Sequence, residues 1–493
     1  MESIEDDATY IRLIFKGFVF ITNKRYETFQ DLGAISRKMS KVLNTYSNLE
    51  NTTESCYMDN GIRLVCERRK SFNTTLGCFL PAGSMYEMPE ERGSVLFLEH
   101  LLFRRTKTHD QLETIVQDIG GKIAAVGMRD MFVFYGTVQS CKVDELVQLF
   151  ADVILNGVIC ATDITEEKCV ILNELAEMEV DREKVVMDYL PTIAYQGTAL
   201  GNSVYTDTDT IKQFSIEKLS GFRSRLFKPC YITMISTGSV CLNELRKMVC
   251  EHFDCKVDDY KSSFGISSRM RTGTESLEYR FSAAELRLRD DDNQLAYVAI
   301  GVEGPSYKQR KEHVAFTVAK QIVGSWDMSY SGVNHNAPYI AHFAYNTDTC
   351  LMYKSFFHNY AQSTSIWGCY FVCERLKIEQ MVAGLRKVWM KLCTTITEKE
   401  VSRAVNQCIA IDLMACNNST NRFFDIVENV FRYGCYESIE QRVTEYEKIN
   451  ADKIREVCGK YVYDQHPVVI ALGRIENLPD YALIRNGLYL LRY

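Results

Sequence analysis

Several features that define large classes of proteins are missing from this sequence. No apolar run approaches the roughly 18 residues that a membrane-spanning helix needs, and the best candidate, residues 11–21, is interrupted by Arg12 and Lys16. An excess of basic residues is also absent, since the net charge is -7, and this argues against the basic face of a nucleic-acid-binding protein. No glycine-rich phosphate loop is present either.

Disulfide and zinc frameworks built from cysteine are not indicated. The 18 cysteines are scattered along the chain without a C-x-x-C pair. Many of them stand among apolar residues, as Cys78 does in LGCFL and Cys458 in REVCGKY. Because free cysteine behaves as a small buried hydrophobe, most of them are expected to be core thiols in a reducing compartment.

Residues 1–50 show no core pattern and are expected to form an N-terminal extension. Between positions 12 and 41 basic residues outnumber acidic ones, as in a targeting segment. Yet the chain begins with Glu2, Glu5, Asp6 and Asp7, and transit peptides are poor in acids. A targeting function is therefore only weakly indicated for this extension.

The remaining chain has the composition of a globular protein, with 46% hydrophobic and 25% charged residues. A length of 493 residues predicts two to four domains. Apolar runs at residues 61–83 predict two paired strands, and further strands are expected at 132–138 and 231–236. Helices are expected at residues 93–103, 111–119, 143–155 and 165–189.

The second half of the sequence repeats the expected order of strands and helices of the first half. LAYVAIGVEGPSY (295–307) corresponds in shape to TTLGCFLPAGSMY (74–86), and helices follow each segment. This faint similarity indicates an internal duplication. The polar residues 256–292 are expected to link a domain at 51–255 to a domain at 293–493. Long helices that alternate with short strands predict an α+β fold in both halves.

The segment GSVLFLEHLLFRRT (93–106) carries the candidate chemistry. Residues i and i+4 share one face of a helix, so Leu96 and His100 point the same way, with Glu99 beside them. This spacing is that of the inverted zinc motif H-x-x-E-H, in which two histidines bind the metal and the glutamate takes a proton from its water. Leu96 stands where the first histidine would be.

A later acidic helix could supply a third ligand. VILNELAEMEVDREKVVMDYL (170–190) carries Glu174 and Glu177 one turn apart, and AYQGTALG (194–201) follows. With these segments the chain, from about residue 57 to 493, resembles peptidase family M16. It is most similar to the branch that holds the mitochondrial processing peptidase beta subunit and core protein 1 of the cytochrome bc1 complex. By this resemblance Glu174 is the third ligand and Glu177 a supporting glutamate.

The resemblance also implies an architecture and a setting. The fold would be two homologous α/β sandwich domains of the LuxS/MPP-like type that close like a clam shell. A bc1 core subunit would be a mitochondrial protein, peripheral on the matrix side of the inner membrane. It would pair with core protein 2, or a processing peptidase alpha-like subunit, and brace cytochrome b and cytochrome c1.

Departures from the family pattern affect the expected activity. Leu96 removes one ligand, which leaves His100 and Glu174, with Glu99 as a relict general base. A catalytic zinc site normally has three protein ligands and one open position. Ala124 replaces a substrate-lining asparagine and Ala361 a tyrosine near the scissile carbonyl. Pro191, in place of a histidine, should bend or end its helix.

Plainer interpretations remain open beside the relict site. His100 could be a satisfied core histidine, and the acids around Glu174 could be a solvated helix face. The leading hypothesis is a non-catalytic complex III core subunit that needs no cofactor. The alternative is a processing peptidase beta-like subunit that uses zinc. A third hypothesis is a subunit that binds presequence peptides without cutting them.

Overall fold

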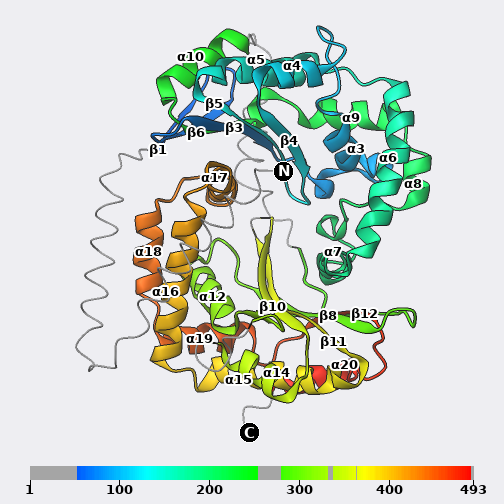
Figure 1. Ribbon diagram of the computed structural model, residues 1–493, viewed down its shortest axis with the longest axis vertical. Coiled ribbons are helices and arrows are strands. Elements are labelled where there is room, and N and C mark those ends of the chain that lie inside the picture. The colour runs from blue at the N-terminus through cyan, green and yellow to red at the C-terminus, as the bar shows by residue number, and fades with distance from the viewer. Residues whose placement is uncertain (1–52, 254–278, 331–336, 362, 490–493) are drawn as a thin grey trace, which may run out of the picture. The chain divides into compact units, whose positions relative to one another are not determined.

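Two six-stranded sheets organise the chain, one from each half of the sequence (Figure 1). The computed structural model describes residues 53–253, 279–330, 337–361 and 363–489. The first sheet has the order β1 (Thr53–Tyr57), β2 (Arg63–Arg68), β6 (Thr233–Gly238), β3 (Asn73–Leu80), β5 (Phe132–Gln139) and β4 (Lys122–Gly127). The second has the order β7 (Glu285–Arg289), β12 (Val468–Gly473), β8 (Leu295–Gly304), β11 (Thr364–Glu374), β10 (Met352–Tyr360) and β9 (Ser325–Asp327).

The two sheets repeat one topology, which confirms the expected duplication. In chain order β2, β3, β4, β5 and β6 match β7, β8, β10, β11 and β12, and each set has the same neighbours. The single parallel pair of each sheet also matches, β2 with β6 and β12 with β7. β1 and β9 are additions at opposite edges. The predicted correspondence of residues 74–86 with 295–307 therefore holds, since β3 and β8 are equivalent strands.

One predicted pairing is wrong. Both strands expected within residues 61–83 exist, as β2 and β3, but they do not pair with each other because β6 lies between them. All six residues of β6 are buried, so this strand needs a partner on each side. Because β6 comes some 150 residues after β3 in the chain, the sequence of β2 and β3 does not indicate that a third strand lies between them.

Helices cover the sheets in both halves. The first half contains α3 (Ser94–Leu101), α4 (Leu112–Ile119), α5 (Val143–Asn156), α6 (Ala161–Val180), α7 (Arg182–Ala194), α8 (Thr208–Lys212), α9 (Ile216–Leu226) and α10 (Leu242–His252). The second contains α12 (Arg310–Val323), α14 (Tyr339–Thr347), α15 (Ile378–Thr394), α16 (Glu398–Ala415), α17 (Ser419–Tyr433), α18 (Ile439–Glu447), α19 (Ala451–Tyr461) and α20 (Tyr481–Gly487). Short 3-10 turns lie at Ser84–Tyr86, Pro89–Glu91, Ser140–Lys142, Ala199–Gly201, Pro229–Tyr231 and Arg375–Lys377.

The helix predicted at residues 165–189 is in fact two helices. Asp181 interrupts it and caps α7, since its carboxylate accepts a hydrogen bond from the Lys184 amide at 3.3 Å. An Asp that satisfies the exposed amides of a first turn is a strong helix start. Pro191 lies inside α7, which ends three residues later at Ala194.

Some sequence expectations concern residues outside the described ranges. The extension at 1–50 and most of the linker expected at 256–292 lie outside the described residues. Within that linker range, β7 is a strand of the second sheet, so those residues are part of the second half. Among the described residues, no helix is both long and apolar enough to cross a bilayer.

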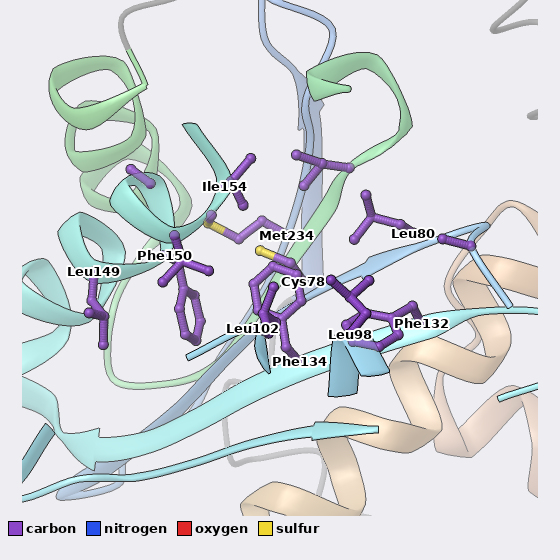
Figure 2. Packing of buried hydrophobic residues seen from close by; sticks show 14 of the residues in the cluster. Cys78, Leu80, Leu98, Leu102, Phe132, Phe134, Leu149, Phe150, Ile154 and Met234 are labelled. Carbon is purple, nitrogen blue, oxygen red and sulfur yellow. The ribbon is translucent and has the colours of Figure 1, made fainter. Parts of the chain in front are cut away.

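The core of the first half anchors the helix that carries the candidate motif. Figure 2 shows Leu98 and Leu102 packed among Phe132, Phe134 and other apolar side chains of the sheet. Burying an aliphatic or aromatic side chain of this size contributes about 1.5–3 kcal/mol. Several such contacts hold α3 in one orientation. The described cysteines are free thiols, and Cys78 and Cys458 are buried, as expected for core thiols.

One helix from each half packs against the sheet of the other half. From the second half, α17 packs Phe423, Ile426 and Val430 against buried residues of the first sheet. From the first half, α7 packs Val186 and Leu190 against the second sheet. The halves therefore share their hydrophobic cores.

Buried ion pairs accompany this exchange. On α17, Arg422 lies 2.7 Å from the Glu67 carboxylate of β2, and both side chains are about 2% exposed or less. Arg432 of α17 lies 3.1 Å from Asp130, in the turn between β4 and β5. In the same turn, Arg129 lies 2.6 Å from Asp188 of α7.

Removing one partner of the Arg422–Glu67 pair should weaken the fold. In Arg422→Met the buried Glu67 carboxylate loses its nearest cation and keeps only Arg69, at 3.8 Å. Breaking a buried ion pair typically costs about 3–5 kcal/mol, and the remaining Arg69 places the expected cost at the lower end of this range. We expect a matching fall in the free energy of unfolding, measured by urea denaturation followed by circular dichroism. The control is Arg455→Met, because Arg455 pairs with Asp452 at the surface and should change stability by about 0.5 kcal/mol or less. Equal effects of the two substitutions would show that the buried pair is not a stabilising link.

Candidate functional site

Helix α3 presents the candidate motif on one face. Gly93 precedes the helix with a φ of 89°, a left-handed conformation that glycine adopts without strain. Leu96 is only 2% exposed and belongs to the hydrophobic core of the first half. Glu99 and His100 lie at the border of this core, where both are only partly buried. The expected position of the first ligand is thus an apolar, core-packed side chain.

His100 is held between two carboxylates of α6. Its Nε2 atom lies 2.8 Å from Oε2 of Glu174, and its Nδ1 atom lies 3.0 Å from Oε1 of Glu167. The structure therefore brings the predicted residues His100 and Glu174 together. It also shows that both ring nitrogens already have a partner.

Glu167 was not among the residues expected from the sequence. It precedes Glu174 by two helical turns, so the two carboxylates share one face of α6. That spacing was visible in the sequence and could have revealed it. Arg104, also missed, lies 2.8 Å from the other oxygen of Glu167 and 3.4 Å from Asp163. It further contacts Glu166. Arg104 therefore fixes the carboxylate that orients the imidazole of His100.

Glu99 points at the edge of the first sheet. Its Oε2 atom accepts a hydrogen bond from the Gly127 amide at 3.0 Å. A Cβ at Gly127 would lie 2.4 Å from a methyl of Val95, so only glycine allows this close approach of β4 to α3. Burial raises the pKa of Glu99, partly offset by the Gly127 hydrogen bond and by His100. The carboxylate is therefore held in place, with a raised affinity for a proton.

Two further groups border the same region. Burial raises the pKa of Tyr205, and the nearby carboxylates of Glu99 and Glu174 add to the effect. Glu87 accepts hydrogen bonds from the amides of Val95 at 2.8 Å and Gly93 at 3.2 Å, at the N-terminus of α3. Burial raises the pKa of Glu87 to about 7.

The donor set does not fit a catalytic zinc ion. His100 and Glu174 are two donors, while Leu96 offers an aliphatic side chain at the third position. Such a site needs three protein ligands. Within the described ranges, no group of three or more His, Cys, Asp or Glu side chains is arranged to hold a metal ion. We therefore derive no reaction step through zinc.

The other predicted residues lie apart from this cluster or at its border. Ala124 is in β4, the edge strand of the first sheet, where it pairs with Tyr135. Glu177 is exposed on α6, one turn after Glu174. The proposed substrate role of Ala124 and the supporting role of Glu177 stay predictions.

Ala361 occupies a strained turn between β10 and β11 of the second sheet. It is buried and has a φ of 49°, which is uncommon for a residue with a Cβ. Its amide donates to Asp130 at 3.2 Å, and its carbonyl accepts from Arg432 at 2.5 Å. Its described contacts are thus with the ion pair that joins the halves. A substrate role for this position also stays a prediction.

Titration of Glu87 should make the stability of α3 depend on pH. Because its pKa is about 7 in the folded chain and near 4.3 when unfolded, its contribution is fully present below about pH 4. It is lost as the pH rises through 7. The stability of the wild type relative to Glu87→Gln should therefore fall by about 2–3 kcal/mol between pH 5 and 8. Urea denaturation at both pH values measures this.

The control for this prediction is Glu90→Gln, an exposed glutamate in the same segment. Its stability difference from the wild type should stay within about 0.5 kcal/mol at both pH values. A Glu87→Gln difference that is equally constant would contradict the buried titration.

Comparisons with known proteins agree with this architecture. Residues 63–208 match Insulinase (Peptidase family M16), and residues 213–408 match the Peptidase M16 inactive domain. The rat mitochondrial-processing peptidase subunit beta is 32% identical over 443 residues, which are 90% of this chain and 88% of that protein. The rat cytochrome b-c1 complex subunit 1 is also 32% identical, over 90% of each chain.

A solved structure shows the same fold. A chain of Complex III2 from Candida albicans, with Inz-5 bound, has a TM-score of 0.77 and covers 89% of this chain and 100% of its own. Its sequence identity is 20%, so this structural match is evidence for the fold alone. The duplicated α+β halves, the two matching domains and the relatives together show that the chain belongs to peptidase family M16.

Proposed function

We propose that this chain is a non-catalytic, core subunit 1-like component of the mitochondrial ubiquinol–cytochrome c reductase, acting as a scaffold. The observation that carries the proposal is Leu96, buried in the core at the position of the first metal ligand. An aliphatic side chain there cannot donate to a metal. It also fills the space with a group that repels water and ions.

The surrounding contacts support an inert site. The Nε2 atom of His100 is paired with Glu174 rather than directed at an open position. Glu99 is bound to the backbone of Gly127. A general base needs a water that is held and polarised, and these residues offer no third ligand to hold one.

The relatives supply the proposed setting. Among the similar proteins are the mitochondrial-processing peptidase subunit beta and the cytochrome b-c1 complex subunit 1, so the homologues are mitochondrial. For this chain we propose the matrix side of the inner membrane, a core protein 2-like partner, and contacts to cytochrome b and cytochrome c1. Obligate interfaces of this type typically bury about 2,000 Å² or more.

A second candidate is a processing peptidase beta-like subunit. It is favoured by the equal identity to subunit beta and by the retained Glu99, His100 and Glu174. With zinc it would cut presequences. Without zinc, the acidic cluster of Glu99, Glu167 and Glu174 would still attract basic presequence peptides electrostatically. This peptide-binding role needs a partner of the alpha type. It does not need a third protein ligand for zinc.

Metal content and partners together distinguish these functions. The tagged chain purified from mitochondria should hold less than about one tenth of a zinc ion per chain, because a catalytic site needs three protein ligands. It should also migrate on native gels with cytochrome b and cytochrome c1. One zinc per chain, together with chelator-sensitive cleavage of a presequence peptide, would overturn the scaffold proposal. Migration with an alpha-type subunit alone would favour the peptide-binding role.

Restoring the missing ligand should rescue metal binding more than activity. In Leu96→His, three donors become available, and we expect zinc to bind about tenfold tighter or better, as measured by competition with a chelating dye. Cleavage of a presequence peptide should stay near background because Ala124 and Ala361 remain. Leu96→Gln is the control, since it is polar at the same place but brings no imidazole. Near-full activity of Leu96→His would show that the two alanines matter little.

A further inference from the structure

The duplication gives the candidate motif a counterpart in the second half. β3 and β8 are equivalent strands, and α3 and α12 are the helices that follow them. Placing residues 295–307 over 74–86 and continuing without a gap brings α12 over α3. Both helices then contact the equivalent edge-side strand, α3 with β4 and α12 with β10.

The counterpart positions reverse the charge of the motif. In this register Thr317 matches Leu96, Lys320 matches Glu99 and Gln321 matches His100. The acidic site of the first half thus corresponds to a cationic position in the second. This is a change of chemistry and not merely a loss, because an ammonium group stands where the carboxylate was.

Lys320 and Gln321 line a cavity of about 570 Å³ between α12, α7 and β10. Cavities of about 300–1,000 Å³ hold small molecules. Lys320 is only partly exposed. Burial and the neighbouring Lys354 lower its pKa. Over the described ranges, no carboxylate lies within ion-pair distance of its ammonium group, and this group makes no hydrogen bond.

The acids of the cavity are already paired. Glu183 lies 2.8 Å from Lys354, and Asp181 lies 3.4 Å from Lys184. Lys320 is therefore the lining cation without a partner in the described part of the chain. Removing the Lys320 ammonium group from water is costly unless a counter-charge compensates it. An anion bound in the cavity would supply this counter-charge.

Part of the lining is apolar, beside polar residues such as Ser325 and Ser355. Met187 of α7, Phe356 of β10 and Tyr370 of β11 line the same cavity. Phe356 also stacks on His358, with ring centroids 5.7 Å apart. An inorganic anion would leave this surface in contact with water. A molecule with a charged head and an apolar tail would satisfy both parts of the lining.

We propose that this cavity binds a small amphipathic carboxylate, with its head at Lys320 and its apolar tail against Met187, Phe356 and Tyr370. The head forms an ion pair that Lys320 lacks, and the tail is removed from water at about 25 cal/mol per Å² of apolar surface. This site is separate from the His100 cluster and does not depend on whether that cluster is inert.

The test titrates octanoate into the purified full-length protein and measures heat release. The wild type should bind it, and Lys320→Gln should bind at least about tenfold more weakly, a loss of about 1.4 kcal/mol. The matched control is Lys311→Gln, an exposed lysine on the same helix, which should bind as the wild type does. Equal binding by wild type and Lys320→Gln would overturn the proposal.

A second variant tests the apolar part. Met187→Gln should weaken octanoate binding but leave the weaker binding of acetate unchanged, because acetate has no tail. Circular dichroism melting curves check that each variant is folded. If inorganic phosphate competed as well as octanoate, or if Met187→Gln bound octanoate normally, the site would be one for simple anions and the amphipathic assignment would be wrong.

Discussion

The ion pair of Asp130 and Arg432 connects the turn between β4 and β5 to α17, beside the turn between β10 and β11. Asp130 lies in the turn between β4 and β5 and also accepts from the Ala361 amide at the end of β10. Arg432 donates to the carbonyls of Asn359 and Ala361. Both charges are buried, so each needs a counter-charge; Arg432 provides it for Asp130, and Arg432 also pairs with Glu428 at 2.6 Å. Because β4 and β10 are equivalent strands, this contact couples the two copies of one hairpin.

The exchange of α7 and α17 follows from the same duplication. Each sheet has two faces that must be covered, and the helices of its own half cover only one. The third helix after β5, α7, covers the second sheet, and the third helix after β11, α17, covers the first. Neither half completes its core alone. The clusters that the exchanged helices form do not include Glu99, His100 or Glu174, so substitutions at these three positions should leave the exchange in place.

The sequence predicted local structure well and long-range relations poorly. The motif at residues 93–106 indicated α3, and the family resemblance placed Glu174 near His100, where the structure has it. The insertion of β6 between β2 and β3 could not be seen, since strand pairing over such distances leaves no local pattern. Glu167 could have been found from its two-turn spacing to Glu174. Its role in holding His100 depends on where α3 crosses α6, which no periodicity gives.

The charged residues around His100 hold one another in place. With Leu96 in the core, the imidazole of His100 has only protein carboxylates for partners, and Arg104 neutralises part of the acidic charge that this requires. These contacts form a polar network that connects α3 and the following Arg104 to α6. Deleting His100 would remove the group that contacts both Glu167 and Glu174, so His100 contributes to the contact between α3 and α6. A histidine at this position of the motif is therefore not by itself evidence for catalysis, because its contacts with Glu167 and Glu174 give it a structural role.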